Sequence, residues 1–144
     1  MILTRKQTVQ EVVDELIKMN NWWSENYSKA PITLVDDCRN KISAYQVTLA
    51  TYVGDAKEDQ LNSERERKFT HHSKKKTLMT ENDFSSIKAE TEAIIACNDL
   101  QKQADLAEAY YTQLNLMLGQ MNKVMEAMQQ HIAIARKEKE NAKA

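Results

Sequence analysis

The last third of the chain carries an apolar seam that repeats with a period of 3.5 residues. Alternating steps of four and three residues pass through thirteen positions without meeting a charged side chain: Ala93, Cys97, Leu100, Ala104, Ala107, Tyr111, Leu114, Leu118, Met121, Met125, Met128, Ile132 and Ala135. A heptad seam of this kind is typical of a coiled-coil helix. The sequence therefore predicts a long C-terminal helix with one face that packs against other helices.

The width and length of this seam predict association. A second apolar line beside it, which includes Leu106, Tyr110, Met117 and Val124, makes the face wider than one partner helix covers. The segment from residue 99 to residue 136 would form a rod of about 57 Å, which we expect the rest of the chain to be too short to cover. We therefore assign self-association, as a helical bundle, to seam residues Tyr111, Leu114, Leu118, Met121, Met125, Met128 and Ile132.

Composition predicts an all-α protein. Two glycines and one proline in 144 residues leave few of the turn formers that usually bound strands. We expect one structural unit in two parts, with a helical hairpin and connector in residues 1–79 and the oligomerising helical region in residues 80–144. No signal peptide or membrane span is recognised, which predicts a soluble cytoplasmic protein. Cys38 and Cys97 lie on apolar helical lines, as reduced core thiols do.

The first half of the chain predicts a hairpin of two helices. A capping pattern begins at Thr4 or Thr8, and the first helix should end before Pro31. Thr33 and Asp36 predict the next helix start, and Gly54 predicts its end. The apolar line of this second helix consists of Val35, Cys38, Ile42, Tyr45, Leu49 and Tyr52. At the end of the first helix, Trp22 and Trp23 point about 100° apart and are interpreted either as packing residues or as an anchor for a partner.

From residue 55 to residue 79 the apolar periodicity fades, which predicts a mobile loop or a short basic helix. Thr80 with Asp83 predicts the cap of a following short helix. A kink or short break is expected at Asn98 and Asp99, and Gly119 is expected to mark a close approach of helices. The charged tail after residue 135 is expected to fray.

The feature with most functional content is residues 64–76, called here the basic stretch. It holds six Arg or Lys against two Glu, a local net charge of +4 in a chain whose total is -1. Such a cluster binds polyanions by releasing their counterions, and an aromatic ring among the cations stacks on unpaired bases. A solvated linker is the alternative interpretation. We assign DNA binding to Arg65, Arg67, Lys68, Phe69, Lys74, Lys75 and Lys76, with His71 or His72 as a further stacking candidate.

No pattern in the sequence supports catalysis. Two isolated glycines do not make a phosphate-binding loop, and no histidine has a glutamate three residues before it, as a di-iron bundle requires. The neighbouring His71 and His72 lack Cys or carboxylate companions at the spacing of a zinc site. We expect a protein that is not an enzyme and that uses no cofactor and no metal.

The order of these features resembles the UvsY-type recombination mediators of T-even-like phages. The resemblance covers roughly residues 33–136 and rests on the helix end Tyr52-Val53-Gly54, the lysine run that closes the connector (residues 74–76), the short helix opened around residues 81–84, the break at residues 98–99 and the long C-terminal helix.

This resemblance implies a protein that forms a closed oligomer, such as a ring, through its C-terminal helix. It also implies binding of single-stranded DNA and assistance to a RecA-like recombinase in displacing the single-strand-binding protein, in a host cytoplasm if the chain is phage-encoded. The connector cations would be the DNA ligands. The chain departs from the family at residues 47–51, where Val-Thr-Leu-Ala-Thr replaces basic residues.

A hypothesis from a different class also fits the sequence. A structural or adaptor coiled coil, such as an assembly factor or an inhibitor that caps another protein, has the same helices and binds no nucleic acid. The two hypotheses differ in one property, since only the mediator requires salt-sensitive affinity for DNA.

Overall fold

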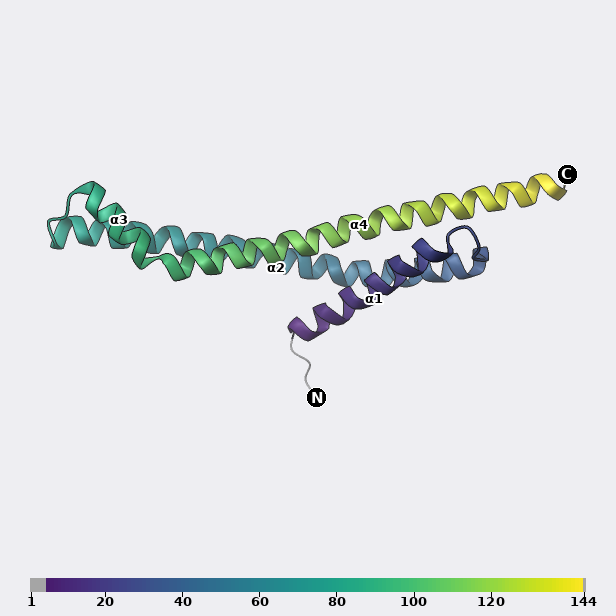
Figure 1. Cartoon of the computed structure of the whole chain (residues 1–144), viewed down its shortest axis with the longest axis horizontal. Coiled ribbons are helices and arrows are strands. Elements are labelled where there is room, and N and C mark those ends of the chain that lie inside the picture. The colour runs from purple at the N-terminus through teal and green to yellow at the C-terminus, as the bar shows by residue number, and fades with distance from the viewer. Residues whose placement is uncertain (1–4, 144) are drawn as a thin grey trace. The chain divides into compact units, whose positions relative to one another are not determined.

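The computed structural model describes residues 5–143, with side chains from residue 9 onward, and it is all-α. The helices are α1 (Arg5–Asn26), α2 (Ile32–Glu81), α3 (Ser86–Ala96) and α4 (Asn98–Lys143), as Figure 1 shows. No strand occurs among residues 5–143. The predicted fold class, with its N-terminal helical hairpin, short helix and long C-terminal helix, is confirmed.

The chain separates into two compact units that divide both long helices. The first unit contains residues 5–52 and 114–143, and the second contains residues 53–113. The boundary that we predicted between residues 79 and 80 falls inside the second unit.

The first unit is a three-helix bundle with a core of large apolar side chains. It consists of α1, the beginning of α2 and the C-terminal half of α4. Its buried residues recur at helical spacing on each helix: Val9, Val12, Leu16 and Met19 on α1, Val35, Ile42 and Leu49 on α2, and Leu114, Met121, Val124, Met128 and Ile132 on α4. Each such side chain contributes about 1.5–3 kcal/mol when it leaves water, so this core stabilises the bundle strongly.

The two tryptophans of α1 face different neighbours, as their adjacent positions require. The Trp23 ring meets the His131 ring of α4 edge to face, with 5.6 Å between ring centroids. Trp22 instead borders an open groove of about 630 Å³ between α1 and α2, beside Met19, Leu34 and Tyr45. Both tryptophans are half buried, and Trp23 is a packing residue against α4 whereas Trp22 borders the groove.

The second unit has a core of small residues. Its buried side chains are Ala56, Leu78, Ala89, Ala93, Cys97 and Ala104. Ala56 and Leu78 lie on α2, and between them this helix carries a line of half-buried polar residues at steps of three and four: Gln60, Ser63, Arg67, His71 and Lys75. Lys57 Nζ of this unit lies 4.7 Å from the centre of the Tyr111 ring, a cation–π contact. The interior of the unit is therefore lined mainly by polar side chains of α2 and by small side chains of α3 and α4.

The predicted connector is part of a continuous helix. α2 runs through Gly54 and through the basic stretch to Glu81, so the predicted end at Gly54 and the loop interpretation are wrong. Gly54 has no positive φ. Residues 55–81 hold no glycine or proline, and Glu64 pairs with Arg67 one turn later at 3.1 Å. These features sustain a helix even though the apolar periodicity is lost.

Several predicted helix ends move in the structure. Because α1 already begins at Arg5, Thr8 is not a cap, and Thr4 lies outside the described residues. α2 begins at Ile32, directly after Pro31, rather than at Thr33. The cap of α3 is Ser85, whose hydroxyl accepts a hydrogen bond from the Lys88 amide, and not Thr80. Asp83, with a φ of 53°, lies in the turn before it.

The predicted break near Asn98 is present and is short. α3 ends at Ala96 and α4 begins at Asn98, while the Cys97 amide still donates to the Ala93 carbonyl. The tail expected to fray is helical through Lys143. Gly119 does not mark a close approach, because no atom of another helix lies within 4 Å of where its Cβ would be. Cys38 and Cys97 are free thiols, and burial raises the pKa of Cys38.

Candidate nucleic-acid interface

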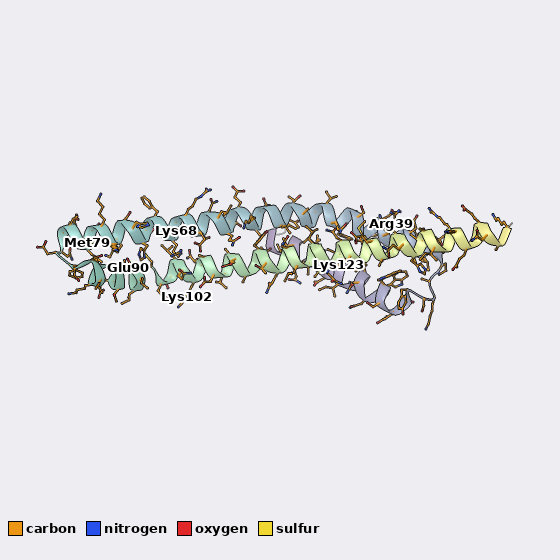
Figure 2. All side chains as sticks on the ribbon, turned by 90° about the horizontal axis from the view of Figure 1, so that it is seen from above. Arg39, Lys68, Met79, Glu90, Lys102 and Lys123 are labelled. Carbon is orange, nitrogen blue, oxygen red and sulfur yellow. The ribbon has the colours of Figure 1, made fainter. Side chains whose placement is uncertain are left out.

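The basic stretch forms three and a half turns of α2 within the second unit. Because a helix turns about 100° per residue, cations that are adjacent in sequence are distributed around its circumference. They therefore separate into an outer line that faces solvent and an inner row that faces α3. Figure 2 shows Lys68 on α2 and Glu90 on α3 in these two helices, which lie side by side.

The outer line consists of four exposed residues at steps of four, three and four: Arg65, Phe69, His72 and Lys76. Phe69 is 75% exposed, although a phenylalanine usually avoids water. Lys68 is also exposed, but it lies about 100° around the helix from Phe69, between the outer line and the inner row. The arrangement places an aromatic face between cations on one side of the helix, as non-specific single-strand binding requires.

The inner row consists of Arg67, His71 and Lys75, all half buried and all paired with carboxylates. Arg67 pairs with Glu64 of its own helix. His71 Nε2 lies 3.0 Å from Glu90 Oε1, and Lys75 Nζ lies 3.0 Å from Glu90 Oε2. These two residues lower the pKa of Glu90, Lys75 having the larger effect, so the Glu90 carboxyl is ionised at neutral pH.

The predicted DNA-binding residues therefore do not act as one group. Arg65, Phe69 and Lys76 share the outer side, whereas Lys68 is exposed between the outer line and the inner row. Lys74 is exposed but lies about 140° around the helix from Phe69, outside this line. Arg67 and Lys75 are occupied within the chain.

A hollow of about 480 Å³ opens beside the inner row. Its lining combines basic, amide and apolar side chains: Arg67, Lys68, His71, His72, Glu90, Ile94, Cys97, Asn98 and Gln101. Glu90 is the one carboxylate among these residues. The Arg67 Nε is buried and has no hydrogen-bond partner among the described residues. The hollow therefore has an excess of hydrogen-bond donors and positive charge.

The residues assigned to self-association lie in the chain's own core. Leu114, Met121, Met128 and Ile132 are buried in the first unit, and Leu118 and Met125 are half buried there. The expectation that the rest of the chain leaves this seam uncovered is wrong for the first unit, because α1 and the beginning of α2 pack with α4 there. Tyr111, in the second unit, is half buried and contacts Lys57.

Sequence reasoning missed Glu90. No local pattern links it to Lys75, because the turn at residues 82–85 sets the register between α2 and α3. His72 was named as a stacking candidate, and its place on the outer line could have been found by continuing a helical projection from residue 65 to residue 76.

Other chemistry finds no support in the described part of the chain. No group of three or more His, Cys, Asp or Glu side chains is arranged to hold a metal ion there. None of the helices within residues 5–143 is long and apolar enough to cross a membrane.

Comparisons of the chain with protein-family models, with curated proteins and with solved structures gave no match. The resemblance to UvsY-type mediators therefore stays a prediction from the sequence.

Proposed function

We propose that this protein is a non-enzymatic recombination mediator that binds single-stranded DNA through the outer line of α2 and helps to load a RecA-like recombinase. The observation that carries the DNA-binding part is the exposed Phe69 between Arg65, His72 and Lys76 on one helix face, with Lys68 exposed beside that face. The loading role rests on the family resemblance of the sequence.

Each component of the outer line has a distinct physical role in this proposal. Arg65, Lys68 and Lys76 neutralise phosphates and release condensed counterions, which gives affinity without sequence specificity. Phe69 stacks on an unpaired base, a contact that duplex DNA does not offer. The line is built on a rigid helix, so the cations keep their spacing before DNA arrives and little conformational entropy is lost on binding.

Self-association remains part of the proposal, but its contacts are assigned to a surface other than the buried residues of the heptad seam. The resemblance implies a closed oligomer, which would repeat the outer line once per subunit and add avidity. Since Leu114, Met121, Met128 and Ile132 are already buried within the chain, the contacts between subunits belong to residues that remain exposed or half exposed in the single chain.

The test of the proposal compares a variant that lacks two cations of the outer line with a variant that lacks two cations elsewhere in the chain. Binding to a labelled oligo-dT strand is measured by fluorescence anisotropy over a range of salt concentrations. We expect Arg65→Ala with Lys76→Ala to weaken binding and to reduce the slope of log K against log[salt] by about 1.4, or about 0.7 for each lost phosphate contact.

The control is Lys137→Ala with Lys139→Ala, which removes the same charge from the exposed end of α4. It should leave the slope unchanged. Equal losses in both variants would show that total charge, and not the outer line, determines binding.

A second candidate function is supported by the surface of α3. Ile87, Ile94 and Ile95 are 83%, 57% and 63% exposed on this 11-residue helix. An adaptor that docks on another protein would use such a surface, and the same anisotropy measurement distinguishes the two functions, because an adaptor has no salt-sensitive affinity for oligo-dT.

A further inference from the structure

The contact between α3 and the inner row places a carboxylate where an anion would otherwise bind. We propose that Glu90 occupies, in the free protein, the position that a DNA phosphate takes in the complex, so that α3 is a displaceable cover over a second row of phosphate contacts. This inference rests on the proposed function and deepens it, because it names a second set of DNA ligands and the group that competes for them.

The geometry at Glu90 is that of a bound anion. One carboxylate accepts hydrogen bonds from two basic side chains of the neighbouring helix, at 3.0 Å from His71 Nε2 and 3.0 Å from Lys75 Nζ. A phosphate offers oxygens of the same kind and spacing to the same donors. Glu90 and a phosphate therefore compete for one site.

The pairing at Glu90 is weak enough to be exchanged. The Glu90 side chain retains 42% of its exposure, so water screens both of its ion pairs. Displacing it leaves the carboxylate in solvent and costs no buried unpaired charge, unlike breaking an ion pair in a protein core.

The packing of α3 is also light. Its buried residues are Ala89 and Ala93, which offer little apolar area to the rest of the unit. Two backbone irregularities bound the helix: the turn with a positive φ at Asp83 on one side and the break at Cys97 on the other. A short helix between two such points can move without unfolding α2 or α4.

The hollow beside the inner row connects it to the outer line. Lys68 and His72, which are exposed, also line the hollow, together with Arg67 and His71. The buried Arg67 Nε supplies a donor that no described residue satisfies. A strand bound along the outer line therefore reaches the inner donors by way of Lys68 and His72, without leaving α2.

The experiment compares Glu90→Gln with Glu92→Gln on labelled oligo-dT. Both variants remove one negative charge from α3, but Glu92 is exposed and forms no ion pair with another described residue. We expect E90Q to bind about three- to thirty-fold more tightly than wild type, because two exposed ion pairs no longer compete, and E92Q to gain less than twofold. Equal gains would overturn the proposal.

Amide hydrogen exchange gives an independent measurement on the wild-type protein. Oligo-dT should speed exchange in residues 86–96 and leave exchange in residues 114–132 of α4 unchanged. Slower or unaltered exchange in α3 would show that the helix stays in place on DNA. Circular dichroism of both variants checks that helix content is preserved.

Titration with inorganic tripolyphosphate separates failure of the inference from failure of the proposed function. If wild type does not bind oligo-dT, the proposed function fails. Shifts of the His71 ring protons by tripolyphosphate, larger in E90Q than in E92Q, would then still support Glu90 as a competitor for an anion. No such difference would overturn the inference as well.

Discussion

The two units of this chain use the same helices with opposite kinds of interior. In the first unit, α2 and α4 meet through Val, Ile, Leu and Met side chains, and none of the buried residues among the described positions is an alanine. In the second unit, four of the six buried residues are alanines, and α2 presents polar side chains inward. One helix thus passes from an apolar to a polar inner face at about residue 56.

The difference indicates a division of roles. Large apolar side chains make the first unit the source of stability, since each contributes more than an alanine can. The second unit is stabilised by packing of small side chains and by ion pairs such as those of Glu90, whose partners can be replaced by water or by a ligand. The candidate DNA-binding line lies in the unit whose interior is easier to rearrange, as binding regions often do.

The largest expected effect comes from truncating one leucine in each unit. Leu49→Ala removes a side chain with 0% exposure from the first core, whereas Leu78→Ala removes one with 7% exposure near the end of α2. We expect Leu49→Ala to lower the free energy of unfolding by about 2–5 kcal/mol and Leu78→Ala to lower it by less. Urea titration of both variants measures the difference, and equal losses would contradict the contrast between the two cores.

A smaller effect is expected from two exposed apolar residues of α2, one in each unit. Phe69 is 75% exposed in the second unit, and Val47 is 71% exposed in the first. Phe69→Ala should weaken oligo-dT binding by about 1–3 kcal/mol, the contribution of one stacked base, without changing the salt slope. Val47→Ala should leave binding unchanged. An equal effect of both would assign the loss to α2 in general and not to the outer line.

The smallest expected effect is a pH dependence confined to the second unit. Because the pKa of Glu90 is lowered in the folded chain, its ion pairs contribute stability above the ordinary value of 4.5, and this contribution is lost as the pH falls through the lowered pKa. Protection factors in residues 86–96, which correct for the slower intrinsic exchange in acid, should therefore fall at acidic pH before those in residues 114–132 do. E90Q should lack this early loss of protection, and E92Q should retain it.

The sequence predicted those parts of the fold in which apolar residues repeat. The heptad seam of α4, the hairpin at Pro31 and the short break near Asn98 follow from side-chain periodicity and from backbone chemistry, and the structure has all three. The prediction of a loop at residues 55–79 was wrong because the inner face of this part of α2 is polar, and apolar periodicity does not reveal such a helix. Gln60, Ser63 and Lys75 continue the inner face of α2 with polar side chains, because the alanines opposite them leave room at the interface.

The two main errors have separate causes. The loop prediction failed because α2 continues through residues 55–81 without an apolar repeat. The prediction of an uncovered seam failed because the predicted hairpin itself, α1 with the beginning of α2, packs with α4 in the first unit, where Leu114, Met121 and Met128 are buried. The site was predicted in part: the cations and Phe69 were found from composition, but their division into two faces depends on the helix, and Glu90 depends on the register of α3.

The most direct test of the central claim is the affinity of the wild-type protein for labelled oligo-dT, measured by fluorescence anisotropy from low to high salt. If the outer line of α2 binds single-stranded DNA, log K should fall with log[salt] with a slope of at least about -2, since Arg65, Lys68 and Lys76 each neutralise one phosphate at about 0.7. Absence of binding even at low salt would contradict the account and favour an adaptor that docks through the exposed isoleucines of α3.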